Sequence, residues 1–123
     1  MLLVVNAGSS SVKLAVFDGA QEVARGQVAE LGPGSHAAAM VDALAQTGVG
    51  LGKITAAAHR IVHGGADLTA PMRLTPAAIA AIEACIPLAP LHNPANLTGI
   101  RVLADLAPDL PQYASFEIGR AHV

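Results

Sequence analysis

The sequence predicts an α/β fold: a mixed sheet with flanking helices, in the order β-β-β-α-β-α-α-β. Near the N-terminus, three apolar segments are separated by short turns rich in Gly, Ser and Asp, which is typical of hairpin-connected strands. Further along, apolar strand-like runs alternate with segments of helical periodicity. Antiparallel strands followed by α/β units indicate a sheet with both strand directions and helices packed against it.

The first three strands form an antiparallel meander in this prediction. Leu2–Val5 is a short apolar run, which is ended by the turn residues Asn6–Ser11. Val12–Phe17 alternates in side-chain type, as a half-buried strand does. The pair Asp18-Gly19 is a strong hairpin signal, and Glu22–Ala29 follows it as the third strand.

The remaining elements are placed by start and stop signals. Ser35 is expected to cap a helix that Gly48 ends, and Thr75-Pro76 and Asn93-Pro94 each start another helix. Two apolar runs are expected to be the last strands of the sheet. The expected segments are a helix over His36–Gln46, a strand over Lys53–His63, helices after Thr75 and after Asn93, and a strand over Leu110–Phe116.

Composition and charge favour a cytoplasmic globular protein. The chain has 123 residues, 53% of them hydrophobic, and a net charge of -2, which gives no electrostatic reason to expect nucleic acid or an anionic membrane as a partner. Cys85 is the only cysteine, so no internal disulfide is possible. No apolar stretch approaches the roughly 20 residues that a membrane span needs, and the apolar start of the chain is too short for a signal peptide.

Asn6 to Lys13, with the sequence NAGSSSVK, is the most informative segment. Gly8 allows a tight turn or a close approach of the backbone to a ligand. The backbone N–H groups of such a turn and its three serine hydroxyls can bind an anion, and Lys13 adds a cation. We therefore predict a site for nucleotide phosphates, although the spacing is not that of a Walker A loop. An ordinary Gly/Ser-rich hairpin turn is the alternative.

Arg60 and His92 are further candidates for anion binding. Arg60 lies near the end of an apolar strand, where a charge has reason to face a cleft, and its guanidinium suits a carboxylate or a phosphate. His92 directly precedes a helix start, where bound anions are favoured. The alternatives are a structural ion pair for Arg60, hydrogen-bonded core positions for the neighbouring His59 and His63, and an ordinary loop position for His92. A zinc site from His59, His63 and His92 is disfavoured, because two residues four apart on a strand lie about 13 Å apart.

Three motifs in series resemble the acetokinase family, that is, acetate kinase with the propionate and butyrate kinases. They are VVNAGSSSVK, AHRIVHGG and LAPLHNPANL, and the resemblance extends from Leu2 to about Phe116, the first third of a family member. It implies the fold of actin, hexokinase and Hsp70, a ribonuclease H-like fold of two lobes. It also implies a cytoplasmic homodimer that uses ATP with Mg²⁺ and transfers the γ-phosphate reversibly to acetate, giving acetyl phosphate and ADP.

The resemblance also implies roles for single residues. Such a reaction needs positioning and charge neutralisation more than covalent help from the protein. By this resemblance, Asn6, Ser11 and Lys13 contact the nucleotide phosphates, and Asn6 is also near the magnesium. Arg60 contacts the acid and the phosphoryl group, and Val62 and Leu91 form an apolar pocket for the methyl group of the acid. His92 stabilises the phosphoryl group in transfer.

The expected domain organisation is an incomplete lobe. Residues 1–117 correspond to the N-terminal lobe, the C-terminal lobe is expected to be absent, and the isolated chain is expected to be inactive. Glu117 stands where the family has a functional Asp, and that role is not carried over. Ile118–Val123 is interpreted as a non-native tail, such as a translated sequencing adapter.

Three alternatives to an acetate kinase stay open. A propionate or butyrate kinase differs only in the acid pocket, so the acid specificity and the direction of flux are not determined. A non-catalytic, actin-like nucleotide-binding module would leave Arg60 and His92 without a role. A structural α/β domain would bind neither ATP nor an acyl phosphate.

Overall fold

The computed structural model describes residues 1–8, 10–32, 35–61, 72–84 and 93–116. Within these ranges the chain forms six strands, three α-helices and one 3-10 helix. In chain order they are β1 (Leu2–Ala7), β2 (Ser11–Asp18), β3 (Gln21–Ala29), α1 (His36–Thr47), η1 (Leu51–Lys53), β4 (Ala56–Ile61), β5 (Met72–Arg73), α2 (Pro76–Ala84), α3 (Asn93–Leu106) and β6 (Gln112–Phe116).

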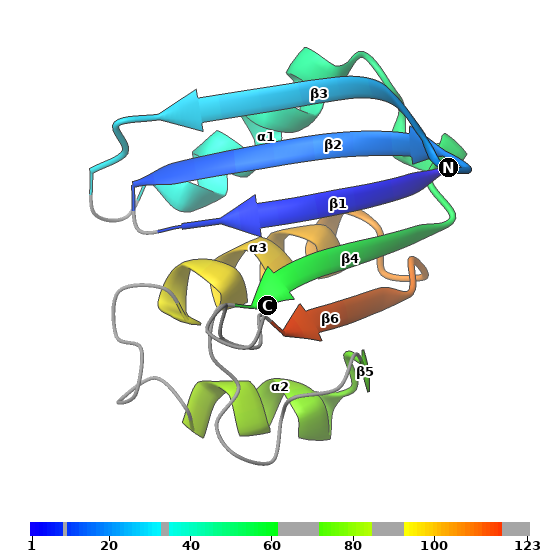
Figure 1. Cartoon of the computed structure of the whole chain (residues 1–123). Coiled ribbons are helices and arrows are strands. Elements are labelled where there is room, and N and C mark those ends of the chain that lie inside the picture. Colours follow the sequence, from blue (N-terminus) through cyan, green and yellow to red (C-terminus); the bar gives the residue numbers. More distant parts are fainter. Residues whose placement is uncertain (9, 33–34, 62–71, 85–92, 117–123) are drawn as a thin grey trace, which may run out of the picture.

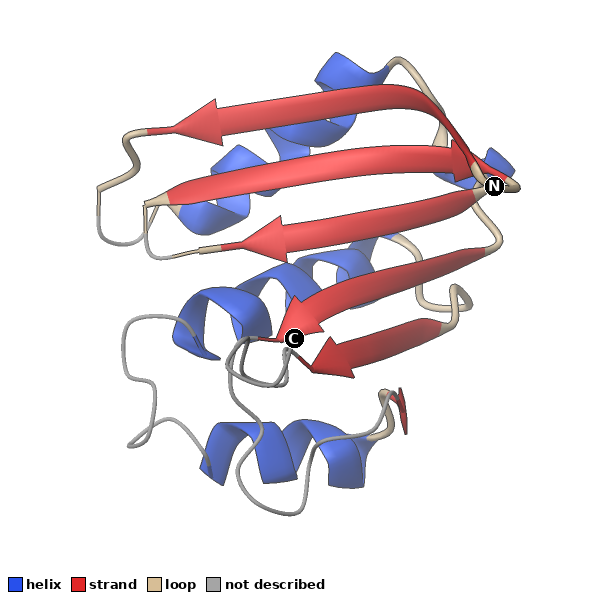
Figure 2. Cartoon of the chain, in the orientation of Figure 1, coloured by secondary structure: helices blue, strands red, loops and turns tan. Residues whose placement is uncertain are grey.

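The strands form one mixed sheet in the order β3-β2-β1-β4-β6-β5. The first three strands are an antiparallel meander, whereas β4 runs parallel to β1, and β6 runs parallel to β4. Helices α1 and α3 lie side by side behind this sheet, and α2 lies beyond the edge near β5 (Figures 1 and 2). The prediction of a mixed sheet with flanking helices is therefore confirmed. None of the helices within the described ranges has the length and hydrophobicity that a bilayer span requires.

The core lies between the sheet and the two helices behind it. Alternate residues of each strand point to this side, as the pleat of a strand requires. They are Leu3, Val5 and Ala7 of β1, Val12, Leu14 and Val16 of β2, and Ala57 of β4, which pack with Ala39, Met40 and Ala43 of α1 and Leu103 of α3. The other face of the sheet has no described helix over it. The strand residues that alternate with the buried ones point their side chains to this open face.

Close packing of α1 on the sheet depends on Gly26. A Cβ atom at this position would lie 2.1 Å from the carbonyl oxygen of Ala43 and 3.2 Å from the Cβ of Gln46. The absence of a side chain in β3 therefore lets the helix backbone approach the strand directly.

The predicted helix boundaries are largely confirmed. Gly48 adopts the left-handed conformation, with φ of 68°, directly after α1, and its N–H donates to the carbonyl of Ala45. At the start of α2, the backbone N–H of Ala78 donates to Oγ1 of Thr75 over 3.2 Å. The prediction for Ser35 is wrong in one respect, because Ser35 precedes α1 but its side chain makes no capping hydrogen bond.

Several predicted boundaries and one element differ from the structure. The strand expected from Leu110 begins only at Gln112. The turn expected over Asn6–Ser11 is shorter, because pairing of β1 with β2 continues to Ala7 and Val12. The strand expected from Lys53 begins only at Ala56, since η1 occupies Leu51–Lys53. The strand β5, which pairs antiparallel with β6, was not predicted, because a strand of two residues has no readable alternation.

Candidate functional site

A hollow of about 290 Å³ lies on the sheet face opposite α1 and α3. It brings together three residues that the sequence singles out, Asn6 from β1, Lys13 from β2 and Arg60 from β4. The described residues that line it are Val4, Asn6, Lys13, Leu14, Ala15, Phe17, Glu22, Arg25, Gly26, Gln27 and Arg60. Residues far apart in sequence thus share one surface.

Strand register explains this convergence. Asn6 and Lys13 are directly opposite each other in the antiparallel pair of β1 and β2. In the parallel pair of β1 and β4, Val5 is opposite His59, so Asn6 and Arg60 follow as the next residues of their strands. Val5 and His59 are buried, and since side chains alternate along a strand, Asn6 and Arg60 project to the open face.

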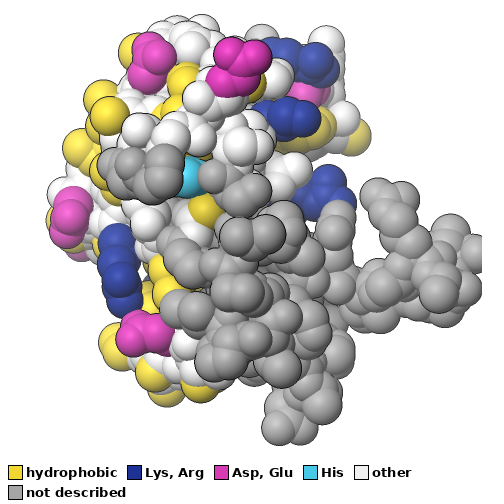
Figure 3. Space-filling model, turned by 90° about the vertical axis from the view of Figure 1, so that its left-hand side faces the viewer, with side chains coloured by type: hydrophobic (Ala, Val, Ile, Leu, Met, Phe, Trp, Pro, Cys, Tyr) yellow, Lys and Arg dark blue, Asp and Glu magenta, His cyan; other side chains and the backbone are white. Residues whose placement is uncertain are grey.

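The hollow has an excess of positive charge. Among the described lining residues, Lys13, Arg25 and Arg60 are positive, and Glu22 is the single carboxylate, which forms an ion pair with Arg25. Figure 3 looks at the end of the sheet that contains the turn between β1 and β2, and Lys and Arg side chains gather on the side of the open face. Lys13 and Arg60 are solvent-exposed, so an anion in the hollow can reach them. The electrostatics favour an anionic ligand.

The turn between β1 and β2 joins the strand ends that carry the lining residues Asn6 and Lys13. The N–H of Gly8 donates to the carbonyl of Ser11 over 2.8 Å, which closes the turn tightly. The N–H of Leu31, just after β3, donates to the carbonyl of Ser10. Ser11 is half-buried at the start of β2 and is not among the described residues that line the hollow. Its predicted phosphate contact therefore has less geometric support than those of Asn6 and Lys13.

Two side chains that the sequence analysis did not select contact the same turn. Nε2 of His36, the first residue of α1, lies 2.7 Å from the carbonyl oxygen of Gly8. Nδ2 of Asn96, in the first turns of α3, donates to the carbonyl oxygen of Ala7 over 2.8 Å and to that of Arg60 over 3.3 Å. Asn96 is 2% exposed, and its Oδ1 is buried without a hydrogen-bond partner among the described residues. Asn96 thus bridges the ends of β1 and β4.

The only signal for these two residues in the sequence was their position at a helix start. His36 follows a Gly/Pro-rich break, and Asn96 follows an Asn-Pro pair. Neither pattern tells which backbone carbonyl the side chain will reach. Their contacts span 28 residues for His36 and 89 residues for Asn96 to Ala7, so only the fold brings the partners together.

His59 belongs to the core rather than to the hollow. It is 1% exposed, and its Nε2 lies 2.5 Å from Oε1 of Gln112. The amide nitrogen of Gln112 donates to the carbonyl of Ile100, so its oxygen faces His59 and the imidazole Nε2 must donate. Burial lowers the pKa of His59 to about 4, although the hydrogen bond to Gln112 acts in the opposite direction. The alternative of a hydrogen-bonded core histidine is therefore correct for His59.

Three predicted site residues cannot be placed. Val62, Leu91 and His92 lie outside the described residues, so the acid pocket and the phosphoryl-stabilising histidine stay predictions. His63, the third histidine of the disfavoured zinc site, lies outside them as well. Within the described part of the chain, no three His, Cys, Asp or Glu side chains are grouped closely enough to bind a metal ion.

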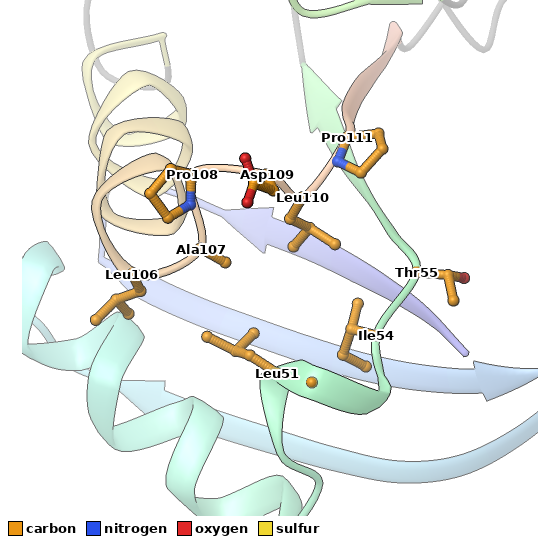
Figure 4. Close-up of a pocket in the computed structure, with 10 residues that line it drawn as sticks. Leu51, Ile54, Thr55, Leu106, Ala107, Pro108, Asp109, Leu110 and Pro111 are labelled. Atoms are coloured by element: carbon orange, nitrogen blue, oxygen red, sulfur yellow. The ribbon is translucent and has the colours of Figure 1, made fainter.

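A second pocket, of about 410 Å³, lies at the other end of the sheet (Figure 4). It is formed between η1, the segment that leads into β4, and the segment that joins α3 to β6, and most of its labelled side chains are apolar. Asp109 is the only charged side chain among the described residues that line it. Thr55 borders this pocket before the start of β4, whereas Arg60 is near the end of that strand, so the two pockets are separate. This second pocket lacks the charge needed for phosphate chemistry.

Comparison with known proteins identifies relatives over nearly the whole chain. The acetokinase family profile matches residues 27–122. The acetate kinase of Streptomyces avermitilis is 41% identical over 94% of this chain, and that of Micrococcus luteus is 43% identical over 95%. These alignments cover 36% and 34% of the two relatives. The chain therefore spans about a third of the length of the curated relatives it matches.

Solved structures of acetate and propionate kinases have the same arrangement of strands and helices. The acetate kinase of Porphyromonas gingivalis superposes with a TM-score of 0.75 and 33% identity, over 94% of this chain and 36% of that one. A propionate kinase from Francisella tularensis gives a TM-score of 0.77 at 35% identity, with the same coverage. The predicted actin- and hexokinase-like fold is thereby confirmed, and this chain belongs to the acetokinase family.

Proposed function

We propose that this chain forms the phosphate-binding part of an enzyme that transfers the γ-phosphate of ATP to acetate, reversibly giving acetyl phosphate and ADP. The observation that carries the proposal is the convergence of Asn6, Lys13 and Arg60 on one cationic hollow. Relatives named acetate kinase, aligned over nine tenths of the chain, support the choice of reaction.

The residues of the hollow suit the chemistry of this reaction. A carboxylate that attacks a phosphoryl group brings one anion to another, so most of the catalytic task is to offset repulsion and to align the reacting atoms. In the proposal, Arg60 binds the acid and the transferred phosphoryl group through its planar guanidinium. Lys13 contributes a point charge to the nucleotide phosphates, and the neutral amide of Asn6 orients them. Val62 and Leu91 would complete the pocket for the acid, and His92 would stabilise the phosphoryl group in transfer.

Magnesium is proposed to arrive with the nucleotide rather than to be held by these residues. Mg²⁺ prefers carboxylate and water oxygens. The hollow offers one carboxylate, that of Glu22, which is already paired with Arg25. The described residues therefore do not fit a protein-held magnesium site. Asn6 would act on a nucleotide-bound ion only indirectly.

The test is a graft that supplies the rest of the enzyme. Residues 1–116 replace the matching segment of the Streptomyces avermitilis acetate kinase, and acyl phosphate formed from ATP and acetate is measured. Loss of one preorganised hydrogen-bond donor to developing charge typically costs about 100-fold or more in rate, so we expect a drop of that order for Arg60→Ala. We expect a smaller loss for Arg60→Lys, which keeps the charge but not the bidentate geometry.

Arg101→Ala is the matched control for this experiment. Arg101 is an exposed arginine of α3 that pairs with Glu83 over 2.9 Å, and it is not a lining residue of the hollow. Its loss should leave the rate unchanged. An active graft whose rate is unaffected by Arg60→Ala would refute the role of the arginine. A correctly folded graft without transfer to any short acid would favour a non-catalytic nucleotide-binding module.

A propionate kinase is the second candidate, because the Francisella tularensis propionate kinase matches as well as the acetate kinase structures do. The relative rates of the graft with acetate, propionate and butyrate discriminate between these enzymes. Highest efficiency with propionate would replace acetate as the proposed substrate. The complete enzyme is proposed to be a cytoplasmic homodimer, and the isolated 123 residues are proposed to be inactive.

A further inference from the structure

We propose that His36 and Asn96 are positioning residues that hold the turn between β1 and β2 in a phosphate-binding conformation. The inference deepens the proposed function and depends on it for the identity of the ligand. Its basis is that donors from two different helices contact two consecutive carbonyl oxygens at the start of this turn, those of Ala7 and Gly8.

Both carbonyl oxygens are held on the helix side of the sheet. Asn96 belongs to α3 and His36 to α1, and both helices lie behind the sheet, opposite the cationic hollow (Figure 1). A carbonyl oxygen accepts hydrogen bonds only, so Nε2 of His36 must be the donor to Gly8, and this nitrogen carries a proton in the imidazolium as well. The contact therefore does not require one particular charge state of His36.

The carbonyls of the other two described residues of the turn, Ser10 and Ser11, are also occupied. That of Ser10 accepts from the N–H of Leu31, and that of Ser11 accepts from the N–H of Gly8. Carbonyl oxygens repel phosphate, whereas N–H and O–H groups attract it. A turn whose described carbonyls all face protein donors can present its donor groups to an anion without first reorganising. Without this preorganisation, part of the free energy of anion binding would be spent on ordering the turn.

The Asn96 side chain adds a link between the turn and Arg60. Its amide nitrogen donates both to the carbonyl of Ala7, where β1 ends, and to that of Arg60 in β4. The nitrogen assignment follows from its partners, since both are acceptors. One buried side chain thus links the end of the strand that leads into the turn to the strand that carries the arginine, beyond their last paired residues Val5 and His59.

The test is a titration of the 123-residue chain with inorganic pyrophosphate, followed by amide NMR shifts. His36→Ala should weaken pyrophosphate binding about tenfold, which corresponds to about 1.4 kcal/mol, comparable to one net hydrogen bond. His36→Gln, whose amide can donate to the same carbonyl, should restore affinity to within about threefold of the original chain. Arg101→Ala, far from the turn, is the control and should bind as the original does. Urea unfolding of each variant confirms that it is folded.

A second measurement does not depend on the ligand. Hydrogen exchange of the Gly8 amide, which donates to Ser11 within the turn, should be faster in His36→Ala and normal again in His36→Gln. If the original chain fails to bind pyrophosphate, the proposed phosphate site is wrong, and the exchange rates still decide whether His36 holds the turn. Unchanged exchange and affinity in His36→Ala, or a His36→Gln variant as impaired as His36→Ala, would overturn the inference.

Discussion

Protonation of the buried His59 should destabilise the fold as the pH falls below neutral. Its folded-state pKa of about 4 lies below the ordinary value of 6.5, so between these values the unfolded chain binds more protons than the folded one. The contribution of the neutral imidazole to stability is therefore complete above the unfolded pKa. It is lost progressively as the pH falls from 6.5 towards 4.

The size of this effect follows from the two pKa values. At 1.36 kcal/mol for each pH unit, the interval between 6.5 and about 4 corresponds to a total of about 3 kcal/mol. Roughly 2 kcal/mol of it should be lost at about pH 5 relative to about pH 7. His59 is 1% exposed, so solvent screening does not reduce this contribution to stability. Such a loss is a large part of the stability of a small domain.

The assay is urea unfolding of the 123-residue chain, followed by far-ultraviolet circular dichroism between about pH 5 and about pH 7, where most carboxylates remain ionised. His59→Gln cannot titrate and keeps a donor for Gln112, so its stability should depend much less on pH. His36→Gln is the matched control, because it removes a less buried histidine and should leave the pH dependence intact. Equal stability of the original chain at both pH values, or an unchanged slope in His59→Gln, would refute the reasoning.

Two further predictions concern packing and strand connection, and the same unfolding assay checks both. Gly26→Ala forces a Cβ atom against the carbonyl of Ala43 and should lower the free energy of unfolding by roughly 2–3 kcal/mol. The control is Gly52→Ala, whose Cβ atom meets open space and which should change stability by no more than about 0.5 kcal/mol. Equal effects of the two substitutions would contradict the close approach of α1 to β3. Asn96→Ala leaves two strand carbonyls without their donor and should cost about 2 kcal/mol. An Asn96→Ala variant as stable as the original would show that this bridge does not stabilise the sheet.

Local patterns were sufficient to predict most of the elements. The alternation of Val12, Leu14 and Val16 marked a strand whose one face is buried, and Gly48 marked the end of α1, because each signal depends on neighbouring residues alone. The antiparallel pairing of the first two strands was predicted, but Asn6 was expected in the turn, so its pairing with Lys13 is known only from the structure. The family resemblance depended on three short motifs, whose order can be read along the chain.

Long-range register was decided only when the chain folded. Whether Arg60 or its neighbour His59 faces the hollow depends on which side of β4 is covered by the helices, and the apolar run that contains both residues does not encode that choice. The contacts of His36 with Gly8 and of Asn96 with Ala7 depend on where α1 and α3 cross the sheet. Packing of helices on a sheet sets these distances, and one residue of register would turn every side chain of the strand to the other face.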